Sequence, residues 1–215
     1  AGIKATASNA YGVFVGKNLA GEIVGNAFNA VTVTSGDETE AFAIKGVYAR
    51  GVYIGDNVGS VSYVGGIVTV ASGGKINNNS FAGIEATSGN AFGVYVADNL
   101  AGEIVGNAFT TISGVTDTMG VRVGRVSGNT VYGGTLTGTI ADNSFGDITS
   151  TGGSAYGVKV YHNIAEEGSI NNNMFAKITA DTADKYASGV AVGHYVIGTG
   201  YLPNSNGAAP FLAGS

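Results

Sequence analysis

Four side chains in the sequence are of types that perform proton transfer or bind anions, and they recur at related spacings. His162 and His194 each stand five residues after a glycine that opens a Gly-Val-x-Val phrase, and Arg122 and Lys159 fill the variable position of the same phrase. An imidazole titrates near neutral pH and can move a proton or bind a metal. Arginine and lysine bind carboxylates. A catalytic site in this chain would be assembled from these four residues.

The same histidines make a poor metal site. In the other copies of the phrase, their position is filled by Lys17, Asp98 and Arg125, and no third ligand stands at a matching position. Zinc centres use at least three protein ligands. The sequence also lacks cysteine, a paired Asp-x-Asp and the calcium-binding Gly-Gly-x-Gly-x-Asp nonapeptide. Two surface histidines that share a register by coincidence explain the pattern better, so we expect neither a metal nor a cofactor.

Two short phrases repeat along the sequence and would position these side chains. The first is Ile-x-x-Asn-x-Phe-x-x-Ile/Val, found at residues 23–31, 76–84, 104–112, 140–148 and 170–178. The second is Gly-Val-x-Val, found at residues 12–15, 93–96, 120–123, 157–160 and 189–192, with degraded forms at 43–47 and 66–70. Its alternation of branched and variable residues is the period of a β-strand with one buried face. Phrases that recur in register indicate stacked structural units.

The first phrase predicts two ladders inside the molecule. Its isoleucine and phenylalanine are five residues apart, and strict alternation would place them on opposite faces of a strand. We therefore expect the chain to turn at the asparagine, a residue that tolerates left-handed backbone conformations. Stacked copies would align the rings of Phe28, Phe81, Phe109, Phe145 and Phe175 and the amides of Asn26, Asn79, Asn107, Asn143 and Asn173. Each amide would donate to and accept from its neighbours.

The repeats predict an all-β chain, folded as a right-handed parallel β-helix of about seven coils. Strands that recur once per coil in one direction, without Asn-Gly hairpin signals between them, form parallel ladders. Parallel crossovers are overwhelmingly right-handed. The phrasing of the second and third coils stays open, because Gly51-Val-Tyr-Ile resembles Gly93-Val-Tyr-Val and would give six coils with a long insertion.

A coil that carries Gly-Val-x-Val and then Ile-x-x-Asn-x-Phe resembles the right-handed parallel β-helix superfamily of pectate lyases, tailspikes and autotransporter passenger domains, whose turns commonly carry stacked asparagines. It is most similar to the repeats of autotransporter passengers and bacterial surface stalks. The resemblance covers residues 1–195 as one domain and leaves 196–215 as an irregular cap, linker or contact between subunits. Because this fold supports both enzymes and inert stalks, the resemblance implies architecture more than activity.

Composition excludes several classes of protein. The 215 residues include 37 Gly and only 2 Pro, and 44% are hydrophobic, so the chain can bury a core and is turn-rich without being disordered. A net charge of −5, with only 10 Lys plus Arg, gives no surface for nucleic acid or for an anionic membrane. No apolar run approaches the ~20 residues that cross a bilayer as a helix.

The variable residue of Gly-Val-x-Val should face outward. Along the coils it is Phe14, Lys45, Tyr95, Arg122, Lys159 and Ala191. Aromatic rings stack on sugar faces and cations bind carboxylates, so Tyr95, Arg122 and Lys159 could line a shallow sugar groove. Enzymes of the superfamily that the chain resembles act mainly on acidic polysaccharides. The alternative function is therefore a polysaccharide lyase, a glycoside hydrolase or a carbohydrate-binding module, with His162 as a further candidate, although ordinary surface decoration explains the column more simply.

The leading prediction is an extracellular or cell-surface structural and adhesive rod without catalysis. Low charge, many small residues and the absence of Cys and Trp suit such a rod. Residues 1–9 match residues 82–90, the latter half of a coil, and no Ile-x-x-Asn-x-Phe completes the coil that begins at residue 189. Open coil ends expose unpaired backbone, which predicts either continuation into a longer chain or head-to-tail self-association. Carbohydrate or a host surface is the other expected partner.

Overall fold

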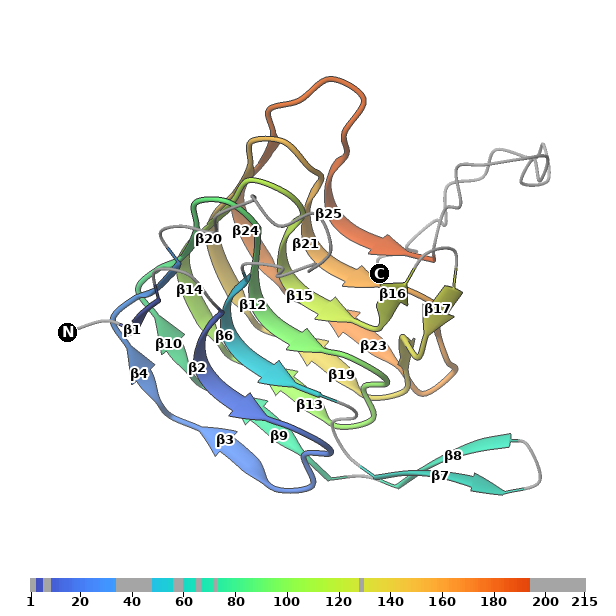
Figure 1. Cartoon of the computed structure of the whole chain (residues 1–215). Coiled ribbons are helices and arrows are strands. Elements are labelled where there is room, and N and C mark those ends of the chain that lie inside the picture. Colours follow the sequence, from blue (N-terminus) through green and yellow to red (C-terminus); the bar gives the residue numbers. More distant parts are fainter. Residues whose placement is uncertain are drawn as a thin grey trace.

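The computed structural model describes residues 3–5, 9–33, 48–55, 60–64, 67–71, 73–127 and 130–193. Every regular element in these ranges is a β-strand, and most strands pair in parallel (Figure 1). Within the same ranges, no helix exists that is long and apolar enough to pass through a bilayer. Lys45, His194 and the segment 196–215, all of which the sequence analysis singled out, lie outside the described residues.

Three parallel sheets form the body of the molecule. Sheet 1 contains β2 (Ala10–Val15), β6 (Tyr48–Ile54), β12 (Asn90–Val96), β15 (Thr118–Val123), β21 (Ala155–Val160) and β25 (Ala187–Val192). Sheet 2 contains β3 (Glu22–Val24), β9 (Lys75–Asn77), β13 (Glu103–Val105), β19 (Thr139–Ala141) and β23 (Ser169–Asn171). Sheet 3 contains β1 (Ile3–Ala5), β4 (Ala27–Phe28), β5 (Val31–Val33), β10 (Ser80–Phe81), β11 (Ile84–Ala86), β14 (Ala108–Gly114), β20 (Ser144–Ser150) and β24 (Met174–Ala180). The chain visits the three sheets in turn, which is consistent with the predicted parallel β-helix (Figure 1).

Two antiparallel hairpins, which were not predicted, interrupt this pattern. One pairs β7 (Ser60–Val64) with β8 (Ile67–Ala71), and the other pairs β16 (Arg125–Ser127) with β17 (Thr130–Tyr132). A small parallel pair, β18 (Thr135–Leu136) and β22 (Asn163–Ile164), follows the second hairpin along the body. In Figure 1 the first hairpin extends away from the stacked sheets.

The register of sheet 1 decides between the two phrasings of the early repeats. Val52 of β6 lies opposite Val13 of β2 on one side and Val94 of β12 on the other. The phrase that begins at Gly51 therefore belongs to the sheet. The sequence also predicts a degraded copy of the phrase at 66–70. That prediction is wrong, because residues 67–70 pair with β7 in the antiparallel hairpin.

A column of glycines in sheet 1 permits the tight stacking of these strands. A Cβ atom on Gly51, Gly93 or Gly120 would lie 2.4–2.6 Å from the carbonyl oxygen of the next glycine in the column. The same atom would lie within 3.0 Å of a phenylalanine ring from sheet 3. Real Cβ atoms do not approach backbone oxygen this closely. Glycine is therefore required here for close approach, and the phenylalanine rings fill the space that it leaves.

The phenylalanine residues of the first phrase form one continuous stack. Successive ring centroids lie 4.6, 5.1, 5.1 and 5.2 Å apart, and the ring planes are within 11° of parallel. The stack runs in the order Phe28, Phe81, Phe109, Phe145 and Phe175. Its middle members are almost fully buried. Each adds up to ~3 kcal/mol of burial free energy before the conformational entropy cost is counted.

The asparagine residues of the same phrase form a hydrogen-bonded ladder with one direction. The amide Nδ2 and the backbone N–H of Asn107 both donate to Oδ1 of Asn143, at 2.9 Å each. Asn79 donates to Oδ1 of Asn107 in the same way, and Nδ2 of Asn107 also donates to the carbonyl oxygen of Ile76 at 2.7 Å. The same bonds recur from Asn26 through to Asn173. The buried side-chain amides of the ladder are thus paired, as burial requires.

A bend in the backbone allows both the isoleucine and the phenylalanine of the phrase to face inward. It lies one residue earlier than predicted. The residues with left-handed backbone are those directly before the ladder asparagines: Gly25, Asn78, Gly106, Asp142 and Asn172, with φ between 50° and 68°. Glycine, asparagine and aspartate are the residues that adopt this conformation most readily. The ladder asparagine itself is kept for hydrogen bonding.

The ladder predicts a large cost for Asn107→Leu. Leucine has a similar volume but would remove the Oδ1 that accepts from the backbone N–H and the Nδ2 of Asn79, and the Nδ2 that donates to the Ile76 carbonyl. Each buried group left unpaired costs ~1 to 3 kcal/mol. We expect denaturant unfolding to show a loss of at least about 3 kcal/mol. Asn18 is exposed and lies in the turn between β2 and β3, so Asn18→Leu should cost less than about 1 kcal/mol. Equal and small losses in both variants would show that the asparagine ladder does not contribute to the stability of the fold.

The glycine column predicts a matched pair of outcomes. Gly120→Ala places a methyl group against the Gly157 carbonyl and the Phe145 ring, and overpacking of this kind costs about 1 to 3 kcal/mol or more. Gly189→Ala, in the last strand of the column, meets nothing closer than Phe175 at 3.9 Å and should change stability by less than ~0.5 kcal/mol. Thermal and denaturant unfolding of the two purified variants compares them directly. A stable Gly120→Ala variant would show that the column tolerates side chains.

Candidate functional site

The outward face of sheet 1 brings together most of the residues proposed for chemistry. Register pairs align Phe14, Tyr53, Tyr95, Arg122, Lys159 and Ala191 as one column. Tyr53 fills the place that the sequence phrasing gave to Lys45. The prediction that Val13 and Val15 face inward while Phe14 faces outward agrees with the burial, since Phe14 is 58% exposed and the two valines pack on the core.

A second outward column beside the first escaped the sequence analysis. It consists of Tyr11, Arg50, Phe92, Met119, Tyr156 and Ser188. In every strand the residue stands directly before the glycine of Gly-Val-x-Val. That constant spacing was the available signal, because an aromatic or basic residue precedes the glycine in four of the six strands.

Cations on this face lie against aromatic rings. The guanidinium carbon of Arg50 is 4.5 Å from the centroid of Tyr53 and 4.9 Å from that of Tyr95. Nη1 of the same arginine donates to the hydroxyl oxygen of Tyr11 at 3.0 Å. Arg50 is only 6% exposed. Each desolvated cation over a ring contributes up to ~2 kcal/mol, so these contacts offset part of the cost of burying the charge.

Arg122 and Lys159, the main candidates for binding an acidic sugar, are held in the same way. The Arg122 guanidinium carbon lies 4.6 Å from the Tyr95 centroid and 4.8 Å from that of Tyr161, and Nε donates to a backbone carbonyl at 3.1 Å. Nζ of Lys159 lies 5.3 Å from the centroids of Tyr156 and Tyr161. It also donates to the Gly193 carbonyl at 2.7 Å. Neither cation forms a salt bridge with a carboxylate of the described residues.

Burial shows that this face is a second, smaller core. Phe92 and Met119 have no exposed surface, and Tyr95, Lys159 and Tyr161 are each 8% exposed. Val126 of β16 and Val131 of β17 pack on the same cluster, so the second hairpin contributes to covering it. The guanidinium groups of Arg50 and Arg122 both lie over the Tyr95 ring, which is only 8% exposed. This arrangement leaves no open ring surface on which a sugar could stack.

Burial shifts the pKa values of four groups on this face: it raises those of Tyr53, Tyr156 and Tyr161 and lowers that of Lys159. Burial lowers the pKa of the Lys159 ammonium, and the negative charge of Asp117 opposes that change. Burial raises the pKa of the Tyr161 hydroxyl to about 12, against the opposing effect of the Arg122 guanidinium. In both cases loss of hydration is the larger cause, since the charged form is the one disfavoured by burial.

The predicted pairing of His162 with His194 is not tested, because only His162 lies within the described residues. His162 is exposed, and its Nδ1 lies 3.5 Å from the hydroxyl oxygen of Thr135. In the backbone ladder Gly134, rather than Arg125, lies between Asp98 and His162. Arg125 instead opens the second hairpin, with its guanidinium 4.8 Å from the Tyr132 ring. His194 lies outside the described residues, and no group of three metal-binding side chains occurs within them.

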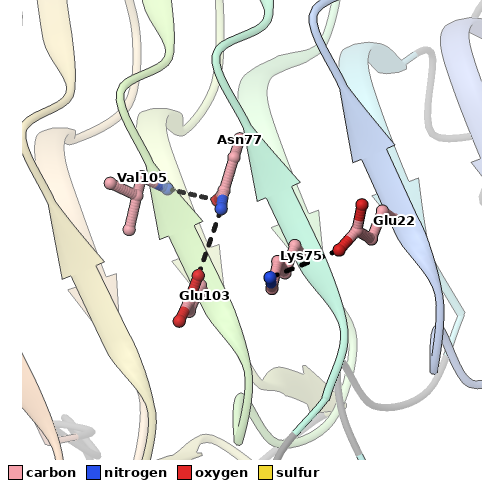
Figure 2. A network of polar contacts seen from close by, with 5 residues as sticks. All are labelled: Glu22, Lys75, Asn77, Glu103 and Val105. Carbon is pink, nitrogen blue, oxygen red and sulfur yellow. Dashed lines mark hydrogen bonds and ion pairs between the residues drawn. The ribbon is translucent and has the colours of Figure 1, made fainter.

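Sheet 2 carries a small polar network on its outer face (Figure 2). Nζ of Lys75 lies 3.3 Å from Oε1 of Glu22, and Nδ2 of Asn77 donates to Oε2 of Glu103 at 3.1 Å. Oδ1 of Asn77 accepts from the backbone N–H of Val105 at 3.0 Å. A hollow of about 300 Å³ adjoins these residues, lined by Gly73, Gly74, Lys75, Ala101, Gly102, Glu103, Gly138 and Thr139. Its charged groups already have partners in the network, and exposed ion pairs of this kind contribute little to stability.

Comparison with known proteins identified no relative of this chain. No protein-family model matches the sequence, and neither a curated protein nor a solved structure gives a match. The geometry of the chain itself is therefore the basis for a functional assignment.

The raised pKa of Tyr161 predicts a loss of stability in alkali. A group whose pKa is higher in the folded state than in the unfolded state stabilises the fold below the unfolded value, and that stability is lost as pH rises through the folded value. The free energy of unfolding should therefore fall between about pH 10 and about pH 12. Tyr161→Phe should reduce that slope, as measured by denaturant titration at several pH values. An unchanged slope in the variant would contradict burial of this hydroxyl.

Proposed function

We propose that this chain is an extracellular structural and adhesive β-solenoid without catalytic activity, folded as a right-handed parallel β-helix. The observation that carries the proposal is the state of the outer face of sheet 1. In its central part the aromatic and basic side chains pack against one another, and Tyr95, Lys159 and Tyr161 are each 8% exposed. Arg122 and Lys159 donate to backbone carbonyls, while Phe14 at the edge strand stays exposed. They therefore stabilise the sheet, where a binding groove would leave them open to a ligand.

The interior supports the same function. A continuous phenylalanine stack and a hydrogen-bonded asparagine ladder run through successive passages of the chain. Such ladders connect each passage to the next and make stability nearly additive along the repeat direction. A rod of this kind maintains length and stiffness, and it presents its outer surfaces to a partner.

The right hand and the extracellular location rest on general arguments. Parallel connections between strands of one sheet are right-handed in the great majority of proteins, because of the twist of the strands. Low charge and absence of cysteine suit a rod exposed outside the cell, where thiols would be oxidised.

A polysaccharide-acting enzyme remains the competing function, and it is directly testable. The purified chain is incubated with pectins and other uronates, and unsaturated products and new reducing ends are measured with and without calcium. We expect no turnover. Activity that is lost in Arg122→Ala or in Lys159→Ala, with folding retained by circular dichroism, would replace the structural proposal with an enzymatic one.

The same two variants separate a structural role from a binding role. If Arg122 stabilises the sheet through its rings, Arg122→Ala should lower the free energy of unfolding by about 1 to 3 kcal/mol and leave binding to immobilised acidic glycans unchanged. Tyr132→Ala, an exposed aromatic substitution on the second hairpin, is the matched control. A variant that keeps its stability and loses glycan binding would contradict the proposal.

A further inference from the structure

The two ends of the stacked sheets expose apolar side chains that the middle of the stack buries. Val94 and Val121 of the central strands have no exposed surface, whereas the corresponding valines of β2 and β25 are partly exposed. Among the described residues, the exposed large hydrophobic side chains are those of Ile3, Phe14, Val24, Tyr132, Met174 and Tyr186. Ile3 shows the effect of the open end directly, since its register neighbour Val31 has no exposed surface.

Strand edges are also open at both ends. At the N-terminal end, the outer edges of β1 and β2 have no partner strand among the described residues, and at the C-terminal end the same holds for β24 and β25. Open parallel edges carry unpaired N–H and C=O groups and readily accept another strand.

The open strands match each other in the residues that face the core. Inward positions read Ala, Gly, Val, Val in β2 at Ala10, Gly12, Val13 and Val15, and again in β25 at Ala187, Gly189, Val190 and Val192. The inward residue of β1 is Ile3, and its counterpart at the end of β24 is Ile178. Pairing β25 with β2 and β24 with β1 would therefore repeat contacts that already exist inside the stack.

One displacement satisfies both pairings. The column that contains β2 and β25 has six strands, and the column β1, β5, β11, β14, β20 and β24 also has six. A second copy moved by six strand spacings along the stack thus places β2 on β25 and β1 on β24 at the same time. Two independent edges of the molecule agree on a single geometry.

On the outer face, the side chains of the two strands that would meet are complementary in size. Beside the joint, β25 presents the small side chains of Ser188 and Ala191, whereas β2 presents the large rings of Tyr11 and Phe14. Inside the joint, Gly189 is the only member of the glycine column from β12 to β25 without a carbonyl oxygen near its Cβ position. Gly12 of a second copy would supply that carbonyl.

We propose that the chain joins end to end with further copies of itself, β25 and the end of β24 in one copy pairing in parallel with β2 and β1 in the next. This inference rests on the proposed structural function and gives the rod its partner. Sheet 2 has five strands, and so does the column β4, β10, β14, β20 and β24 of sheet 3, which carries the phenylalanine stack. The same displacement therefore leaves a gap one strand wide between β23 and the β3 of the next copy, and another between β24 and the β4 of the next copy. The two seams in sheets 1 and 3 alone make the joint.

A cysteine pair across the second seam tests the proposal, because the chain has no cysteine of its own. The register of sheet 3 places Lys4 of one copy beside Thr179 of the next, at a strand spacing of ~4.8 Å that suits a disulfide. Lys4→Cys combined with Thr179→Cys should form a ladder of covalent multimers on oxidation, dispersed by a reductant. Lys4→Cys combined with Thr149→Cys is the matched control, since Thr149 is covered by β24 and should give no ladder.

Gly189→Ala tests the other seam without a cross-link. A methyl group there meets nothing closer than 3.9 Å within one copy, but it would lie against the Gly12 carbonyl of a second copy. Sedimentation velocity should show the parent chain forming concentration-dependent multimers and the variant remaining monomeric with an unchanged melting temperature. Gly21→Ala, where a Cβ meets nothing within 4 Å, should assemble like the parent.

The outcomes separate this proposal from the proposed function. Equal multimer formation by the Thr179 and Thr149 pairs, with both folded by circular dichroism, would overturn the joint. If the first pair fails to fold, Phe14→Cys with Ala191→Cys tests the seam in sheet 1 by the same readout. A chain that stays monomeric and lacks uronate turnover refutes the joint alone, whereas a chain that assembles and degrades uronates refutes the structural function alone.

Discussion

The fold depends on one constraint: parallel strands stack at ~4.8 Å, so each side chain must pack against its own counterpart in the next passage. The phenylalanine centroids, 4.6–5.2 Å apart, meet this spacing as flat stacked rings. Asparagine meets it because an amide donates at one end and accepts at the other. Glycine meets it where a carbonyl of the next strand occupies the space of a Cβ. Each column therefore selects a residue type that tolerates a copy of itself.

Because a stacked interior requires self-matching residues, it leaves a period in the sequence, and the columns at Phe109 and Asn107 could be found without a structure. The position of the bend, one residue before the ladder asparagine, is harder to read, since the residue there varies among glycine, asparagine and aspartate, as at Gly106, Asn78 and Asp142. The hairpins were missed for a different reason. Gly65-Gly66 stands between β7 and β8, and Gly128-Asn129 between β16 and β17, and both dipeptides are hairpin signals that a search for Asn-Gly alone overlooks.

The outer face of sheet 1 was harder to predict because its chemistry depends on neighbours that are distant in sequence. Alone, Arg122 beside Lys159 in register indicates an anion site, since like charges on adjacent strands repel. In the structure, aromatic rings surround each cation, so no bound anion is required to stabilise the pair. Several of these rings belong to the second outward column or to the turn at Tyr161. Only the three-dimensional register, together with the covering hairpin, shows that the cations are already satisfied.

A self-matching interior also has no intrinsic end, because the last copy of each column presents the same surface as every copy before it. A solenoid stops growing only where its edge residues change in shape, charge or backbone hydrogen bonding. In this chain the inward residues of β2 and β25 do not change, and the outward ones change from large aromatic to small. Edges that keep the core pattern and complement each other in size favour continued stacking over termination, and this is the physical basis of the proposed end-to-end joint.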